Sequence, residues 1–226
     1  MQGGGVAIII KICGISTIEA AVAARDFGAD LLGFVFAEGK RQISLEQAKQ
    51  IACQLSGIGK VGVFVNAPLG EVQQVARECK LDYVQLHGEE SPEYCRLLGY
   101  PVIKAFNYTS GFSSAVFEGY QTAWTLMDSC IAGRQGGTGI VFDWRQAAEL
   151  LARHTNRLLF VAGGLTPENV AEAIDILQPD GVDVSGGVET NGQKDIEKIQ
   201  RFITAAKEGL HAKQDCKSNQ GNYKRS

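Results

Sequence analysis

Three reactive or charged side chains follow short apolar runs of this sequence. Cys13 and Asp128 each come directly after such a run, and Arg41 lies in the loop after another. A thiolate can act as a base or a nucleophile, and a buried carboxyl group can act as a general acid. An arginine can hold a carboxylate with a two-pronged hydrogen bond. The plain structural alternatives are a small buried packing residue for Cys13, a helix cap or solvated carboxylate for Asp128, and a surface charge for Arg41.

Two glycine pairs follow two consecutive apolar runs in the last third of the chain. Gly163 and Gly164 follow the first run, and Gly186 and Gly187 follow the second, after Ser185. Glycine lets backbone N–H groups approach a phosphate closely, and the start of a following helix favours an anion. One such pair often marks only a turn, but two pairs at consecutive strand ends predict a phosphate site. His87 follows a further run and is expected either to be catalytic or to hydrogen-bond within the rim.

The elements that must position these side chains alternate along the chain. The predicted strands are Ile8–Ile12, Leu31–Phe36, Val61–Val65, Tyr83–Leu86, Val102–Phe106, Trp124–Met127, Leu158–Val161 and Val182–Val184. The predicted helices are Thr17–Gly28, Ser44–Ser56, Pro68–Cys79, Pro92–Leu98, Trp144–Arg153, Pro167–Leu177 and Asp195–Lys207. The segment 107–121 is rich in Gly, Ser and Tyr, so we expect a degenerate helix there.

These units favour a (βα)8 TIM barrel in the α/β class. The strands are nearly all apolar rather than alternating, as in sheets buried on both faces. Eight strand–helix units in about 200 residues fit a closed, single-domain barrel better than an open doubly wound sheet. We expect residues 1–207 to form the catalytic barrel and residues 208–226 to be a polar, disordered C-terminal tail. Because barrel active sites lie at the C-terminal ends of the strands, the side chains described above should converge.

Bulk composition excludes several classes of function. The 226 residues are 45% hydrophobic and 21% charged, with a net charge of −3 and dispersed basic residues. This balance argues against a nucleic-acid or membrane partner. There is neither a signal peptide pattern nor an apolar run long enough to span a bilayer. Six cysteines without a C-x-x-C pair and three scattered histidines predict no metal site, and reduced thiols indicate a cytoplasmic protein.

Short motifs at the predicted strand ends and loops together resemble the phosphoribosylanthranilate isomerase family, over about residues 9–205. They are Lys11-Ile12-Cys13-Gly14, Gly33-Phe34-Val35-Phe36, Val61-Gly62-Val63-Phe64-Val65-Asn66, Val84-Gln85-Leu86-His87-Gly88, Gly136-Gly137-Thr138-Gly139 with Phe142-Asp143-Trp144, Ala162-Gly163-Gly164-Leu165, and Val182-Asp183-Val184-Ser185. The resemblance implies an aldose–ketose isomerase of tryptophan biosynthesis. It would convert N-(5'-phosphoribosyl)anthranilate to 1-(2-carboxyphenylamino)-1-deoxyribulose 5-phosphate by an Amadori rearrangement without a cofactor.

The resemblance also implies a role for each candidate residue. Cys13 matches the general base, Asp128 the general acid and Arg41 the arginine that holds the anthranilate carboxylate. Asp183 is expected to shape the anthranilate pocket. The glycine loops, with Ser185, match the phosphate grip. The implied partner is a small phosphoribosyl substrate, and the chain is expected to be a monomer or a homodimer.

The sequence departs from the family pattern at three places, one of which is Glu38-Gly39-Lys40 in the loop that should present Arg41. Gly186 stands where the family usually has a second serine, which removes one hydroxyl but keeps the backbone donors. Ile140 stands where a lysine is common.

Three other functions are alternatives to this one. Indole-glycerol-phosphate synthase would require catalytic lysines and a glutamate at strand ends. A histidine-pathway sugar isomerase would require aspartates where Cys13 and Asn107 stand. A non-catalytic phosphoribosyl-binding barrel would need neither Cys13 nor Asp128.

Overall fold

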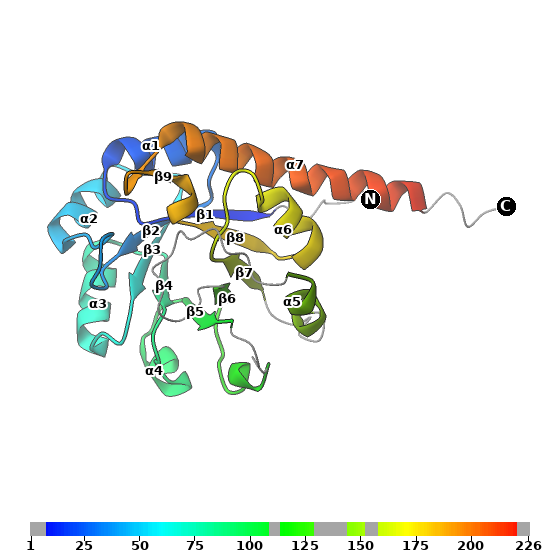
Figure 1. Cartoon of the computed structure of the whole chain (residues 1–226). Helices are drawn as coiled ribbons and strands as arrows, with labels where there is room; N and C mark the ends of the chain where they lie inside the picture. Colours follow the sequence, from blue (N-terminus) through cyan, green and yellow to red (C-terminus); the bar gives the residue numbers. More distant parts are fainter. Residues whose placement is uncertain (1–7, 109–113, 129–143, 152–157, 221–226) are drawn as a thin grey trace.

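The computed structural model describes residues 8–108, 114–128, 144–151 and 158–220 and contains a closed barrel of eight parallel strands (Figure 1). The strands are β1 Ile9–Cys13, β2 Leu31–Val35, β3 Gly59–Phe64, β4 Tyr83–Leu86, β5 Val102–Asn107, β6 Trp124–Asp128, β7 Leu159–Ala162 and β8 Gly181–Val184. Each strand pairs with its neighbour in sequence, and β8 pairs with β1. The predicted TIM barrel is therefore confirmed.

Helices connect the strands and cover the outside of the barrel. They are α1 Ile18–Phe27, α2 Leu45–Cys53, α3 Leu69–Glu78, α4 Pro92–Leu97, α5 Trp144–Leu151, α6 Val170–Leu177 and α7 Ile196–Gln220. The described part of the connection between β5 and β6 holds only a 3-10 turn, η1 Ser114–Phe117. This agrees with the degenerate helix predicted there.

Local sequence signals set several helix ends. Thr17 accepts a hydrogen bond from the Ala20 amide, and Ser44 accepts one from the Gln47 amide, so both are N-caps. Helix α6 starts at Val170, three residues later than predicted. Asn169 explains this delay because its side chain accepts a hydrogen bond from the Thr166 amide at 2.8 Å and stabilises a turn first.

The inside of the barrel has an apolar floor and polar groups above it. The floor contains buried residues from five of the strands: Leu31, Val61, Ile103, Ala105, Leu126, Phe160 and Ala162. Side chains two residues apart on a strand share a face, so Lys11 and Cys13 follow Ile9 into the interior. Lys11, Gln85 and Asp183 are all buried. The strands are thus nearly all apolar, as predicted, and these three side chains are polar exceptions in the interior.

The chain after β8 differs from the prediction in two ways. A short hairpin, β9 Glu189–Thr190 and β10 Gln193–Lys194, precedes the last helix. Helix α7 then continues to Gln220, past residue 208, where we expected a disordered tail to begin. Good helix formers such as Glu208 and Ala212 allow the helix to continue. Residues 221–226 lie outside the described part.

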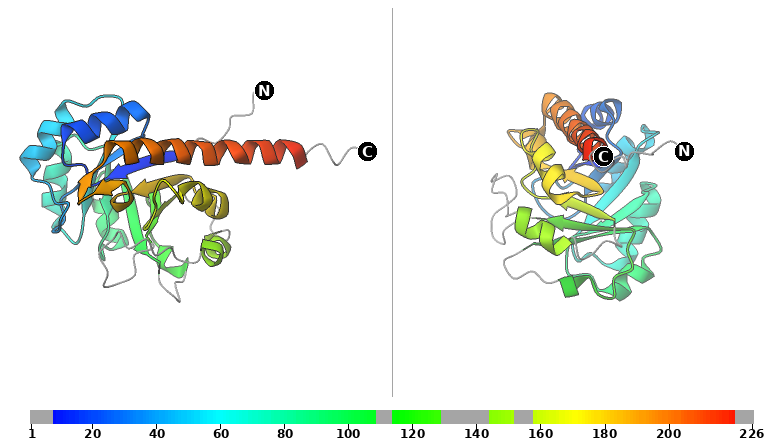
Figure 2. Two further views of the ribbon diagram at one scale, coloured as in Figure 1. Left: turned by 45° about the horizontal axis from the view of Figure 1, so that its top comes forward. Right: turned by 90° about the vertical axis from the view of Figure 1, so that its right-hand side faces the viewer.

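The end of α7 extends past the barrel (Figures 1 and 2). Its buried anchors, Ile199, Phe202, Ile203 and Ala206, lie in its first three turns. None of the helices in the described ranges is long and apolar enough to cross a membrane.

We predict that deleting residues 212–226 leaves kcat/KM within about twofold of the full chain. The deletion keeps the four buried anchors of α7, and surface changes away from buried contacts typically alter stability by at most about 0.5 kcal/mol. Steady-state kinetics and thermal unfolding of the two proteins check this. A large loss of turnover in a truncated protein that still unfolds cooperatively would contradict it.

Candidate active site

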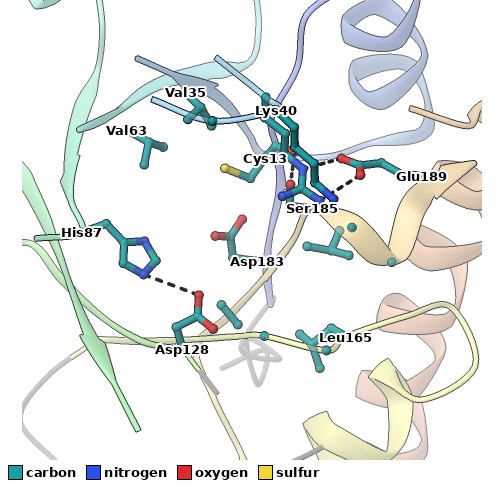
Figure 3. Close-up of a pocket in the computed structure, with 18 of the residues that line it drawn as sticks. Cys13, Val35, Lys40, Val63, His87, Asp128, Leu165, Asp183, Ser185 and Glu189 are labelled. Atoms are coloured by element: carbon teal, nitrogen blue, oxygen red, sulfur yellow. Dashed lines mark hydrogen bonds and ion pairs between the residues drawn. The ribbon is translucent and has the colours of Figure 1, made fainter. Parts of the chain in front are cut away.

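A cavity of about 660 Å³ opens at the C-terminal ends of the strands (Figure 3). Every site residue predicted from the sequence lines it: Cys13, Arg41, Asp128, Gly163, Gly164, Asp183, Ser185, Gly186 and Gly187. The volume lies within the range of small-molecule sites, which is about 300–1,000 Å³. Cys13, Asp183 and Asp128 point toward the same space in Figure 3.

Cys13 lies beside a fully buried ion pair. Lys11 is inaccessible to solvent, and its Nζ donates to Asp183 Oδ1 at 2.9 Å. Burial raises the pKa of the Cys13 thiol above its ordinary value, while the charge and hydrogen bonding of Lys11 lower it. Burial by itself lowers the pKa of Lys11, but attraction to Asp183 and Cys13 outweighs this and raises it. Lys11 therefore keeps its positive charge at neutral pH.

Asp128, at the end of β6, faces His87 in the loop after β4. His87 Nε2 lies 3.5 Å from Asp128 Oδ2, and His87 Nδ1 lies 3.3 Å from the side-chain nitrogen of Gln85. Burial lowers the pKa of His87 and the nearby Asp128 charge partly opposes this, so the imidazole is neutral at neutral pH. The sequence left the role of His87 open, and the structure brings it next to the candidate acid.

Arg41 makes a two-pronged ion pair with Glu189. Its Nε and Nη2 donate to the two Glu189 oxygens at 2.6 and 2.8 Å. Lys194 also donates to Glu189 at 2.6 Å, so one carboxylate is shared by two cations. These hydrogen bonds outweigh the effect of burial and lower the pKa of Glu189. Arg41 is thus fixed by the hairpin after β8 rather than being a solvated surface charge.

The glycine loops have local reasons to contain glycine. Gly163 and Gly164 have φ angles of 84° and 67°, in the left-handed region that side chains disfavour. A Cβ on Gly187 would collide with the carbonyl oxygen of Leu165. The loops after β7 and β8 therefore touch each other here, which draws both glycine pairs to one side of the cavity.

Sequence reasoning missed part of this arrangement. Glu189 and Lys194 were not considered, and Lys11 was noted beside Cys13 without a role. A lysine in the middle of an apolar strand, two residues before a strand-end cysteine, was the available signal. The sequence also gives no sign that the pKa of the Cys13 thiol is raised, which follows because burial outweighs Lys11. Among the described residues, no cluster of three or more His, Cys, Asp or Glu side chains is arranged to hold a metal ion.

Some sequence predictions fall outside the described ranges. The motif Gly136-Gly137-Thr138-Gly139, the substituted Ile140, and Phe142-Asp143 lie in the stretch 129–143.

Comparisons with known proteins show the family of this chain. The family model described as N-(5'-phosphoribosyl)anthranilate isomerase matches residues 10–205. An N-(5'-phosphoribosyl)anthranilate isomerase of Bacillus cereus (strain AH187) is 45% identical over 203 residues, covering 88% of this chain and 98% of its own.

Two solved structures are similar throughout. The phosphoribosyl anthranilate isomerase of Thermotoga maritima is 38% identical with a TM-score of 0.80, covering 89% of this chain and all of its own. A phosphoribosyl anthranilate isomerase in complex with reduced 1-(o-carboxyphenylamino)-1-deoxyribulose 5-phosphate is also 38% identical, with a TM-score of 0.76 and the same coverage. This chain belongs to the N-(5'-phosphoribosyl)anthranilate isomerase family.

Proposed function

We propose that this protein catalyses the Amadori rearrangement of N-(5'-phosphoribosyl)anthranilate, with Asp128 as general acid and Cys13 as general base. The observation that supports these roles most is that both side chains line one cavity, between Arg41 and the glycine loops. An aldose-to-ketose shift needs one acid and one base on a substrate held at both ends.

Asp128 carries out the first step. Its carboxyl O–H protonates the furanose ring oxygen, the bond from C1' to that oxygen breaks, and the anthranilate nitrogen lone pair forms a C1'=N double bond. The carboxylate that remains faces His87 Nε2 at 3.5 Å. His87 is neutral at neutral pH, so it stabilises this carboxylate as a dipole and not as a cation.

Cys13 carries out the second step. Its thiolate takes the proton from C2', the C–H electrons form a C1'=C2' double bond, and the electrons of the C=N bond return to nitrogen. The resulting enol-amine becomes the ketone when the C2' hydroxyl loses its proton and C1' gains one. Protons are the only species transferred, so neither a redox cofactor nor a metal is needed.

The two ends of the substrate are held by different loops. Arg41 binds the anthranilate carboxylate, and Asp183 shapes the pocket beside it. Ser185 and the backbone N–H groups of the two glycine pairs hold the phosphate. Binding energy at both ends then orients the ribose between Cys13 and Asp128. We further propose that the protein acts in tryptophan biosynthesis. We place it in the cytoplasm, because thiols such as Cys13 stay reduced there.

The direct test is the fluorescence of phosphoribosylanthranilate, generated in place, after purified protein is added with a metal chelator present. We expect rapid, protein-dependent loss of the signal, because neither step needs a metal. Persistent fluorescence with folded protein would contradict the proposed reaction.

Replacing the base should affect turnover and not binding. We predict that Cys13→Ser lowers kcat by about 100-fold or more, the usual contribution of general acid–base catalysis. Binding of the reduced product analogue should stay within a few-fold of the unmodified protein, because Arg41 and the glycine loops are intact. Single-turnover kinetics and calorimetry measure the two quantities. Near-normal turnover of this variant would rule out Cys13 as the base.

Replacing a glycine of the proposed phosphate loop should weaken substrate binding more than it lowers turnover. We predict that Gly187→Ala raises KM about tenfold or more, because the added Cβ displaces the Leu165 carbonyl and separates the two loops. The fall in kcat should be smaller, since Cys13 and Asp128 lie on other strands. Gly70→Ala is the matched control for a glycine away from the cavity, because Gly70 has no left-handed φ and a Cβ there meets no atom within 4 Å. An unchanged KM in Gly187→Ala would exclude these loops from phosphate binding.

A further inference from the structure

Beside Cys13 lies a buried lysine whose part in the chemistry is not explained by the acid, the base or the two groups of residues that hold the ends of the substrate. Lys11 is fully buried at the middle of β1, and its ammonium group has Asp183 as its ion-pair partner at 2.9 Å. Burying a charge costs free energy even when the charge is paired, and an apolar pair of similar volume is often as stable or more so. A stabilising role for the fold is therefore a weak reason for an ion pair at this place.

The backbone next to Cys13 leaves room for the lysine. Gly33 lies opposite Cys13 in the pairing of β1 with β2. The point where a Cβ of Gly33 would lie is 2.7 Å from Cys13 Sγ and 3.2 Å from Lys11 Nζ. The thiol and the ammonium group flank the same point, so any side chain at position 33 would compete with their approach.

The charges around Cys13 come from three strands. Lys11 lies on its own strand, Asp183 on β8 and Lys194 on β10, while β2 contributes the uncharged Gly33. Farther across the cavity, His87 is neutral at neutral pH and faces Asp128. Lys194 is committed elsewhere, because its Nζ donates to Glu189 at 2.6 Å and to the Ser185 carbonyl at 3.0 Å.

We propose that Lys11, oriented by Asp183, is a positioning residue that supplies the positive charge next to the Cys13 thiolate and so makes a buried thiol usable as a base. This inference rests on the proposed function of Cys13. Ionisation of the thiol turns a neutral carboxylate–ammonium pair into a three-charge cluster with a net charge of −1. Burial is the main cause that opposes thiolate formation, and Asp183, which holds the cation, opposes it less than Lys11 favours it.

This arrangement predicts shifts of opposite sign for the two partners. Lys11→Met removes the cation and should raise the pKa of Cys13 by about one unit or more, which lowers kcat/KM at neutral pH about tenfold or more. The rising limb of the pH–rate profile should move to higher pH. Asp183→Asn removes the opposing charge and should lower the pKa of Cys13.

The pKa of Cys13 can be measured without substrate. The rate of alkylation by iodoacetamide at each pH follows the thiolate fraction, and mass spectrometry of the peptide that contains Cys13 separates it from the other cysteines. Lys194→Met is the matched control for a second nearby lysine and should shift this pKa less than Lys11→Met. An unchanged pKa in folded Lys11→Met, or a larger shift in Lys194→Met, would overturn the proposal.

Lys11→Met leaves Asp183 buried without its partner and can fail to fold. If Lys11→Met does not fold, the double variant Lys11→Met, Asp183→Asn replaces it in the test, because neither charge of the pair remains. Its Cys13 pKa must lie above that of Asp183→Asn alone, and equal values would refute the role of Lys11. These titrations do not depend on turnover. A failure of Cys13 as the base would appear in Cys13→Ser kinetics while the thiol shifts remained measurable.

Discussion

The pairing of β1 with β8 closes the barrel, and the geometry of the active site depends on this seam. Lys11 lies opposite Asp183 in its register, and Cys13 follows two residues later on the same inward face. A one-residue slip would turn Cys13 toward the helices and separate the ammonium group from its carboxylate. The seam also brings Ser185 to β1, because its hydroxyl donates to the Cys13 carbonyl oxygen at 3.1 Å. The proposed base, the cation beside it and the proposed phosphate loop are therefore positioned by one strand pair.

Along the barrel axis, apolar packing at the N-terminal end of the strands gives way to polar groups at the C-terminal end. An apolar floor, with members such as Val61, Leu126 and Phe160, fills the N-terminal part and makes the strands rigid. The polar groups above the floor have side-chain partners. Lys11 pairs with Asp183, and His87 contacts both Gln85 and Asp128. Arg41 comes from a loop, yet Glu189 fixes it from the hairpin that follows β8. Fixing the guanidinium in advance reduces the conformational entropy that substrate binding would otherwise cost.

The fold and the set of cavity residues were predictable from the sequence because their signals are local. Alternating apolar runs and capped helices gave the barrel, and the barrel rule placed Cys13 and Asp128 at one rim. The Arg41–Glu189 pair was not predictable, since the two residues are 148 positions apart and meet only through closure of the barrel. The raised pKa of Cys13 was not predictable either, because burial depends on the packing of the whole interior. The extension of α7 was missed because polar composition was taken as a sign of disorder.

A crystal structure of this protein with the reduced product analogue tests the central claim, the orientation of the substrate across the cavity, most directly. We expect the phosphate on the loops of Gly163–Gly164 and Gly186–Gly187 and the carboxylate on Arg41. We also expect the carbon that corresponds to C2' next to Cys13 Sγ, with Asp128 near the former ring oxygen. A ligand bound in the reverse orientation, or with that carbon remote from Cys13, would contradict the account.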